Sequence, residues 1–201
     1  MSTDLGHRCA NKAFRNFLPG LGLILIDRDG TLSYENPLGR ASEYVELIPG
    51  SATAIEYLKR AGYYLVSVSN QARIGRGEIT EDRLMAVNAH LNSQIMHQGG
   101  GWGLDYFLYC PHEDGCPWRK PEPGMLLFAC QQLGIAPKAT TIVGDSHKDI
   151  WAGQAVGART IQVLTRNLVS DGTPKPCQPN HTAPDLLAAA HLILRLDGLE
   201  T

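Results

Sequence analysis

Short apolar runs alternate with longer amphipathic stretches along the chain from residue 21 onward. The runs are continuous rather than alternating in polarity, as expected of strands that helices cover on both faces. They predict five strands, at residues 21–26, 64–69, 105–110, 140–143 and 159–164. Strands separated by helix-length segments are typical of repeated βα units. We therefore predict an α/β fold, a single Rossmann-like, three-layer domain with a central parallel sheet.

Helix-length segments with apolar residues at helical spacing separate the predicted strands. They predict helices at about residues 51–61, 81–97, 123–133, 148–156 and 185–196. Thr80 precedes the second of them as the expected N-cap. Glycine follows three of the helices, where a left-handed residue commonly ends a helix: Gly62, Gly134 and Gly157.

The length and composition suit one globular domain. The chain has 201 residues, 43% of them hydrophobic, which is enough to fill a single core. We assign this domain to residues 21–201 and interpret residues 1–20 as an N-terminal arm. The proline-rich stretch at residues 170–184 is predicted to be a loop.

Charge and cysteine content exclude several classes of protein. Eighteen Lys and Arg residues against 20 Asp and Glu give a formal net charge of −2, which argues against nucleic acid as a partner. No segment approaches the roughly 20 apolar residues of a membrane span, and the N-terminus lacks a secretory signal. We expect a cytoplasmic monomer with no membrane partner. Because five cysteines are an odd number, we expect no disulfide framework, and Cys9, Cys130 and Cys177 should be free thiols.

Two acidic residues directly follow the first predicted strand. Asp27 and Asp29 stand at positions i and i+2, so they point the same way where the chain leaves the sheet. Gly30 then permits a sharp turn. Ligands of open α/β sheets bind at the carboxyl ends of the strands, so the position favours a functional site. The alternative for this motif alone is a turn aspartate that caps the next helix.

A second acidic motif follows the fourth predicted strand, where Asp145 and Asp149 lie in the sequence Gly-Asp-Ser-His-Lys-Asp. Carboxylates that converge at one sheet edge repel one another unless a cation lies among them. A small number of hard oxygen ligands, with room for water and phosphate, favours Mg²⁺. The two acidic motifs together therefore predict a magnesium site.

Four motifs resemble, in order and in structural context, those of the haloacid dehalogenase superfamily. They are Asp27–Thr31 after the first strand, Ser69-Asn70 after the second, Arg119-Lys120-Pro121 before a helix, and Gly144–Asp149 after the fourth strand. The resemblance covers about residues 21–165. It implies a magnesium-dependent phosphatase that acts through an aspartyl-phosphate intermediate.

The resemblance implies a role for each acid. Asp27 is the expected nucleophile, and a divalent cation offsets its repulsion from the phosphate dianion. Asp29 is the expected general acid and base, and its backbone carbonyl is expected to bind Mg²⁺ together with Asp27 and Asp145. Asp149 is expected to orient Lys120 or an outer-shell water.

The two middle motifs are expected to bind the phosphoryl group. Ser69 and Asn70 would donate hydrogen bonds to its oxygens, and Lys120 would neutralise charge that develops on them. In isolation, Ser69 is equally compatible with a helix or turn cap, and Lys120 with a solvated surface lysine.

The spacing of the motifs leaves no room for a large cap domain, so loops at 33–48, 71–80 and 110–120 should determine specificity. The segments 69–77 and 119–125 resemble the branch of the superfamily that removes the 7-phosphate of D-glycero-D-manno-heptose 1,7-bisphosphate. Histidinol-phosphate phosphatases are the near relatives. The expected partner is therefore a small phosphorylated sugar.

A bisphosphorylated sugar requires a second anion site, and guanidinium groups bind phosphate through bidentate hydrogen bonds. Arg73, Arg76 and Arg119 are the candidates, with Asn70 and Gln71 as further substrate-binding residues. Each arginine is also compatible with an ordinary surface position.

Two other classes of function fit the residues less well. A non-catalytic module that binds phosphorylated metabolites could share the fold, but Asp27, Asp29 and Asp145 are all intact. A polynucleotide 3′-end phosphatase would need a basic, aromatic groove for the strand, which the near-neutral charge does not supply.

Cys110, His112 and Cys116 have spacings compatible with a zinc site. The resembled phosphatases commonly carry four ligands here, but Trp118 stands at the fourth position and cannot coordinate a metal. Zinc with three protein ligands, completed by water, Glu113 or Asp114, is one interpretation. The alternative is a metal-free loop with two free thiols, because structural zinc sites normally have four protein ligands.

Overall fold

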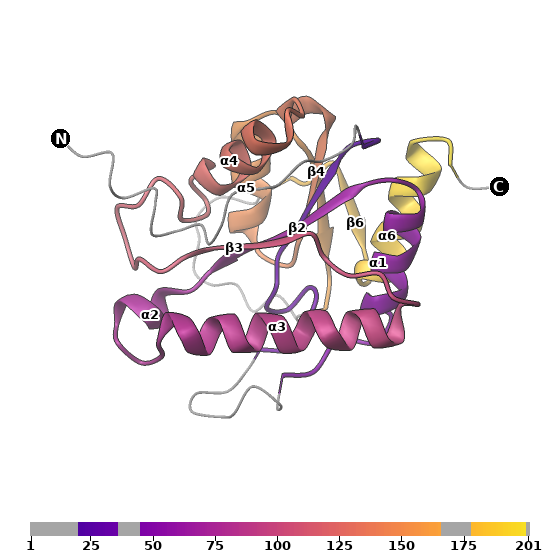
Figure 1. The fold of residues 1–201 in the computed structure, drawn as a ribbon. Helices are drawn as coiled ribbons and strands as arrows, with labels where there is room; N and C mark the ends of the chain where they lie inside the picture. Colours follow the sequence, from indigo (N-terminus) through magenta and orange to yellow (C-terminus); the bar gives the residue numbers. More distant parts are fainter. Residues whose placement is uncertain (1–19, 36–44, 166–177, 200–201) are drawn as a thin grey trace.

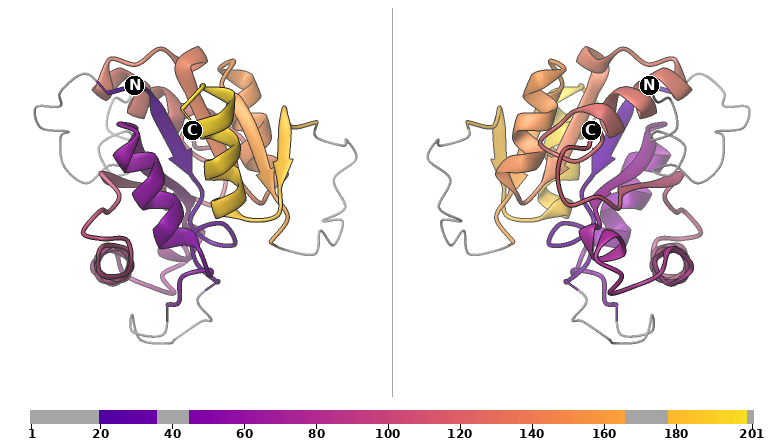
Figure 2. Two further views of the ribbon diagram at one scale, coloured as in Figure 1. Left: turned by 90° about the vertical axis from the view of Figure 1, so that its right-hand side faces the viewer. Right: turned by 90° about the vertical axis from the view of Figure 1, so that its left-hand side faces the viewer.

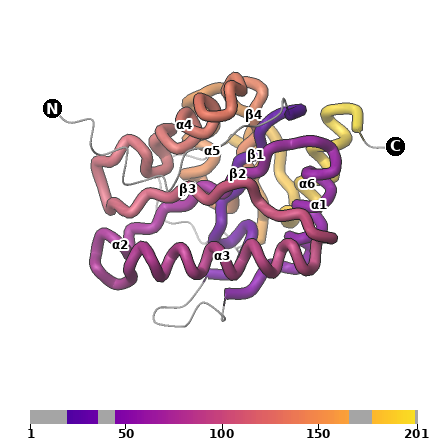
Figure 3. Tube along the Cα trace, viewed as in Figure 1, coloured from indigo at the N-terminus to yellow at the C-terminus, as the bar shows by residue number. Residues whose placement is uncertain are grey.

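A parallel sheet of six strands forms the centre of the protein, with helices packed around it (Figure 1). The computed structural model describes residues 20–35, 45–165 and 178–199. The strand order is β3-β2-β1-β4-β5-β6, so β1 and β4 lie in the middle. Figure 3 shows the Cα trace from the same side as Figure 1. The strands are β1 (Leu23–Ile26), β2 (Tyr64–Asn70), β3 (Tyr106–Cys110), β4 (Thr140–Gly144), β5 (Arg159–Val163) and β6 (His181–Ala183).

Helices cover both faces of the sheet, which confirms the predicted three-layer α/β architecture (Figure 2). The helical elements are α1 (Ser51–Arg60), α2 (Ala72–Gly75), α3 (Glu81–Gln98), α4 (Gly124–Leu133), η2 (Pro137–Ala139), α5 (His147–Ala155) and α6 (Leu186–Leu196). One apolar core joins α1 and α6 to the sheet, and a second joins α4 and α5 to its other face. Neighbouring residues of β1 serve opposite cores: Ile24 belongs to the first and Leu25 to the second.

The predicted N-cap and the three glycines predicted to end helices are confirmed. The Thr80 hydroxyl accepts a hydrogen bond from the Arg83 backbone N–H at 3.1 Å, as an N-cap should. Gly62, Gly134 and Gly157 have φ values of 93°, 66° and 71°, which end the preceding helices in the left-handed region.

Two segments predicted to be loops contain regular structure, so those predictions are wrong in part. Residues 72–75 of the 71–80 loop form the short helix α2. Residues 181–183 of the 170–184 loop form β6, which pairs in parallel with β5. Residues 181–183 form a strand because they pair with β5, and so short a segment carries too little pattern to predict a strand from its sequence. Most of the predicted arm and residues 170–177, with Cys9 and Cys177, lie outside the described residues. Among the helices that the structure describes, all are too short or too polar to cross a lipid bilayer.

The sheet register brings the motif-bearing strand ends together. Ile26 of β1 is paired with Ser67 of β2 on one side and with Val143 of β4 on the other. The Asp27 backbone N–H extends the ladder by donating to the Val143 carbonyl at 2.9 Å. The residues that follow β1, β2 and β4 therefore meet at the carboxyl edge of the sheet, where ligands bind in open α/β folds.

Candidate active site

Asp27 lies at the end of β1 and is 8% exposed. Its Oδ1 atom accepts hydrogen bonds from the Arg28 backbone N–H and from Lys120 Nζ, both at 2.8 Å. These bonds fix the carboxylate at the sheet edge. Among the described residues no donor reaches Oδ2, so this oxygen is open to a metal ion or a phosphoryl group.

Lys120 is a buried residue rather than a solvated surface lysine. Its Nζ donates to Asp27 Oδ1 at 2.8 Å, to Asp149 Oδ1 at 2.5 Å and to the Val68 carbonyl at 2.6 Å. Burial disfavours the charged ammonium, but the carboxylates of Asp149 and Asp27 outweigh that effect and hold the pKa of Lys120 above its usual value. Lys120 is therefore a fixed positive charge beside Asp27.

Three carboxylates, from Asp27, Asp145 and Asp149, converge at the ends of β1 and β4. Oxygen atoms of the three lie within 4.8 Å of one another, and all three residues are buried. Burial and the Asp27 carboxylate raise the pKa of Asp149 to about 6, against the opposing effect of Lys120. Such a set of hard oxygen ligands suits Mg²⁺. The prediction that Asp149 orients Lys120 agrees with their direct contact.

Local structure explains the position of Asp149. Its carboxylate accepts from the Ser146 backbone N–H at 3.2 Å and completes a capping box at the start of α5. Gly144 lies against it so closely that a Cβ atom there would collide with the Asp149 carboxylate. A residue without a side chain is therefore required at the end of β4.

The Asp29 carboxylate has a different set of partners. Arg28 donates to Asp29 Oδ1 from Nε at 3.0 Å and to Oδ2 from NH2 at 2.7 Å. Gln71 Nε2 adds a third bond, to Oδ2, at 2.9 Å. Arg28 was not among the site residues predicted from the sequence. Its position between the two acids of one motif is the signal that would have found it.

Ser69, Asn70 and Gln71 lie at the predicted strand end, but the structure connects them mainly to one another and to Lys120. Gln71 Nε2 donates to Ser69 Oγ at 2.6 Å. The Asn70 side chain donates to the Lys120 carbonyl at 2.7 Å and accepts from the Lys120 N–H at 3.0 Å. Asn70 therefore anchors the backbone of Lys120, a contact that its predicted role as a phosphate donor did not include.

All three predicted arginines, Arg73, Arg76 and Arg119, line one cavity of about 690 Å³ together with Asp29. Arg76 forms ion pairs with Glu78 and, at 2.8 Å, with Glu113 of the neighbouring loop.

The other two arginines are also held in place. Arg73 lies 3.4 Å from Glu78, and Arg119 donates to the His112 carbonyl at 2.9 Å. These contacts hold guanidinium groups of the segments 72–76 and 110–120 at one cavity.

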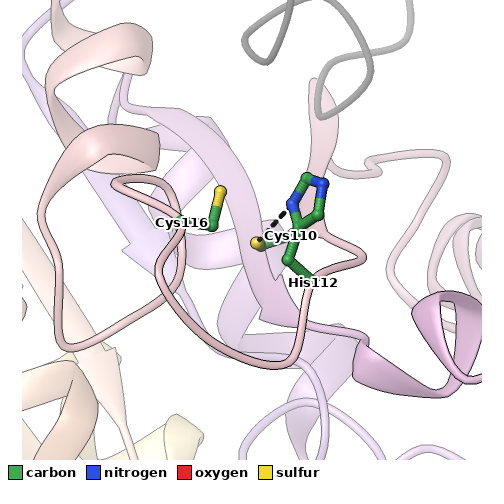
Figure 4. A group of neighbouring side chains, drawn as sticks. All are labelled: Cys110, His112 and Cys116. Atoms are coloured by element: carbon green, nitrogen blue, oxygen red, sulfur yellow. Dashed lines mark hydrogen bonds between the residues drawn. The ribbon is translucent and has the colours of Figure 1, made fainter.

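Cys110, His112 and Cys116 converge as a second group of potential metal ligands (Figure 4). Cys110 Sγ lies 3.6 Å from His112 Nδ1, and one ligand atom of each residue lies within 4.8 Å of the other two. Gly115, at φ 67°, lies in the turn that brings Cys116 back toward Cys110.

Among the cysteines that the structure describes, Cys110, Cys116 and Cys130 form no disulfide. Trp118 packs against Phe128 of α4, with ring centroids 4.8 Å apart. The indole at the predicted fourth ligand position is therefore part of the apolar packing and supplies no ligand.

Comparison with known proteins places this site in a family. The HAD-hydrolase-like family model matches residues 117–189. The D-glycero-β-D-manno-heptose-1,7-bisphosphate 7-phosphatase of Pseudomonas putida is 38% identical over 71% of this chain and 82% of its own length. The enzyme of the same name from Pasteurella multocida is 33% identical over 85% and 95%.

Solved structures agree with the sequence relatives. The D,D-heptose 1,7-bisphosphate phosphatase of B. bronchiseptica, solved with magnesium and phosphate, has a TM-score of 0.77 and 28% identity. The match covers 87% of this chain and 99% of that one. The order of the motifs, the parallel sheet and these relatives agree: the chain is a phosphatase of the haloacid dehalogenase-like hydrolases and belongs to the family of the heptose bisphosphate phosphatases.

Proposed function

We propose that this protein removes the 7-phosphate of D-glycero-β-D-manno-heptose 1,7-bisphosphate in a magnesium-dependent reaction. The observation that carries the proposal is a buried Asp27–Lys120 pair beside Asp29, which borders a cavity that three arginines line. The names of the relatives support the substrate and its β-anomer.

The reaction has two steps, and the proposed residues account for both. An oxygen of the Asp27 carboxylate attacks phosphorus, and the bond from phosphorus to the sugar oxygen breaks. Asp29, which takes up a proton at one oxygen in exchange for a donor that its ionised carboxylate accepts from, gives this proton to the leaving oxygen. Asp29 then takes a proton from water, which attacks the aspartyl phosphate and releases inorganic phosphate and the Asp27 carboxylate. Lys120, which already contacts Asp27, stabilises the negative charge on the transferring group.

Mg²⁺ fits the carboxylate cluster. Asp27 and Asp145 would hold it with their side chains, and Asp29 with its backbone carbonyl. The ion would offset the repulsion between an attacking carboxylate and a phosphate dianion. Asp149 is less suited to be a direct ligand because its oxygens already bind Lys120 and the Ser146 N–H.

The arginines favour a bisphosphate over a monophosphate. A substrate whose 7-phosphate reaches Asp27 extends into the arginine-lined cavity, where a second phosphate can replace Glu78 or Glu113 as the partner of Arg76. Asn70 and Gln71 line the same cavity and remain candidates for contacts to the sugar. Histidinol phosphate, the substrate of the nearest alternative, has no second phosphate to use these charges.

Two measurements test the proposal. Asp27→Asn and Asp29→Asn should each lower turnover by at least about 10²-fold, because one removes the nucleophile and the other the proton-transfer group. Circular dichroism should show both variants folded. Retained activity in purified Asp27→Asn would contradict the mechanism.

The substrate is tested by comparing kcat/KM for heptose 1,7-bisphosphate and histidinol phosphate. The bisphosphate should be preferred, and Arg76→Ala or Arg119→Ala should narrow the preference by about 1–3 kcal/mol of transition-state binding. Faster turnover of histidinol phosphate would make the alternative the better assignment.

We further propose that Cys110, His112 and Cys116 bind zinc, with water as the fourth ligand. The proximity of the three ligand atoms supports the site, whereas a structural zinc with only three protein ligands is unusual. Glu113 is a poor fourth ligand because it pairs with Arg76. Elemental analysis of protein purified without added metal or chelator should find near-stoichiometric zinc that is lost in Cys116→Ser. A fully active, zinc-free protein would refute the site.

A monomeric state and a cytoplasmic location remain predictions. Size-exclusion chromatography with light scattering tests the first, and fractionation of the native host tests the second.

A further inference from the structure

The side-chain rotamer of Asp29 does not by itself fix the orientation of its carboxylate. The terminal torsion of an aspartate is broad, so an unrestrained carboxylate rotates through a wide range. Arg28 contacts both of its oxygens through a two-pronged guanidinium fork, at 3.0 and 2.7 Å. Such bidentate pairs fix the plane of the carboxylate as well as its position.

Arg28 is itself restrained by a residue from another part of the chain. Its NH1 atom, which the fork does not use, donates to Asn88 Oδ1 of α3 at 3.2 Å. Arg28 is 5% exposed and Asn88 8% exposed, so water competes little for these bonds. The contact spans 60 positions of the sequence. It connects a helix that carries none of the four motifs to the first motif.

Asn88 is unusual among the residues that α3 buries. The other buried positions are apolar: Leu84, Val87, Leu91 and Ile95. A buried amide costs free energy unless it is hydrogen-bonded, and the Asn88 amide oxygen accepts from the Arg28 guanidinium. A polar side chain among these buried apolar positions therefore indicates a role other than helix packing.

We propose that Arg28 and Asn88 are positioning residues that hold the Asp29 carboxylate in line with the leaving oxygen of the substrate. This inference rests on the proposed function, in which Asp29 gives and takes the proton. Asn88 fixes the Arg28 guanidinium, the guanidinium fixes the carboxylate plane, and Gln71, which follows β2, donates to one of the carboxylate oxygens.

The chemistry of the leaving group separates this role from a structural one. A sugar alkoxide is a strong base and needs a proton as it departs, whereas p-nitrophenolate departs without one. A misaligned Asp29 should therefore lower kcat/KM for an alkyl phosphate and spare kcat/KM for p-nitrophenyl phosphate. A general loss of structure would lower both together.

The test compares kcat/KM for the two substrate types, with Mg²⁺, in Asn88→Leu and Arg28→Lys. The first removes the acceptor at similar volume, and the second keeps the charge but loses the fork. We expect the ratio of alkyl to aryl kcat/KM to fall about 10-fold in each, with the aryl value within about 2-fold of wild type. If Asn88→Leu does not fold, Arg28→Lys decides alone.

Asn92→Leu is the matched control. Asn92 lies one turn further along α3, and its Oδ1 accepts the Leu104 N–H at 2.8 Å, a contact that involves neither Arg28 nor Asp29. This change should lower stability without altering the substrate ratio. An unchanged ratio in Asn88→Leu and Arg28→Lys, or an equal loss on both substrates, would overturn the inference.

Asp29→Asn separates this inference from the proposed function. It should show the largest fall in the ratio. If it shows none, Asp29 is not the acid and the proposed mechanism fails. If it shows a fall while Asn88→Leu and Arg28→Lys do not, only the positioning role fails.

Discussion

Replacing Lys120 with methionine tests how the buried charges at the sheet edge are balanced. Lys120 is 3% exposed, and it lies between Asp27 and Asp149 with contacts of 2.8 and 2.5 Å. Methionine keeps much of the length and apolar volume of lysine but removes its charge. Two buried carboxylates would then face each other, with Asp145 beside them, without their shared cation.

The expected loss of stability is large. Breaking a buried ion pair by removing one partner typically costs about 3–5 kcal/mol, because the remaining charge stays buried without compensation. Lys120 has two such partners, so without metal the free energy of unfolding should fall by at least about 3 kcal/mol. Mg²⁺ can replace part of the lost positive charge. At 100 times its dissociation constant, bound Mg²⁺ adds about 2.7 kcal/mol to the free energy of unfolding.

The assay is urea unfolding of wild type and Lys120→Met, each in EDTA and in saturating Mg²⁺. The stability difference between the two proteins should be smaller with Mg²⁺ than without it, because the variant has more uncompensated negative charge for the ion to neutralise.

Lys59→Met is the matched control. Lys59 pairs with Asp105 at 2.7 Å, and both side chains are less than one fifth exposed. Its loss should destabilise the protein by roughly 1–3 kcal/mol, to the same extent with and without Mg²⁺. A loss below about 1 kcal/mol in Lys120→Met, or an equal effect of Mg²⁺ on both variants, would refute the charge balance described above.

Three further changes have defined outcomes. Gly144→Ala should displace Asp149, because the added Cβ would collide with its carboxylate. The change should lower turnover, and it should lower the free energy of unfolding by about 1–3 kcal/mol. Unchanged steady-state kinetics would contradict this. Tyr63→Phe removes a 2.5 Å hydrogen bond to Asp197 and should cost about 1–2 kcal/mol in urea unfolding with no change in kcat. Thr80→Ala removes the N-cap of α3 and should lower stability by about 1 kcal/mol, which a thermal melt can detect.

Features that depend on neighbouring residues in the sequence were predictable from it. A continuous apolar run such as Leu23–Ile26 is buried whichever strand lies beside it, so its identity as an interior strand could be predicted. Asp27 and Asp29 follow it directly, and the carboxyl end of a parallel strand is where α/β sheets bind ligands. Lys120 was expected beside these acids because its motif resembles that of a known superfamily. Its burial and its contact with Asp149 agree with that expectation.

Features that depend on contacts between distant segments were decided by the tertiary structure. The three residues of β6 form a strand because β5 offers an open edge. Asn70 anchors Lys120 across 50 positions, and Asn88 reaches Arg28 across 60. A residue's type limits which hydrogen bonds it can form, but the partner is chosen by which side chain the fold brings within about 3 Å. The sequence by itself therefore determined the first five strands along the chain and the acids that follow two of them, whereas the packing of α3 and the loops against the sheet decided which groups hold those acids in place.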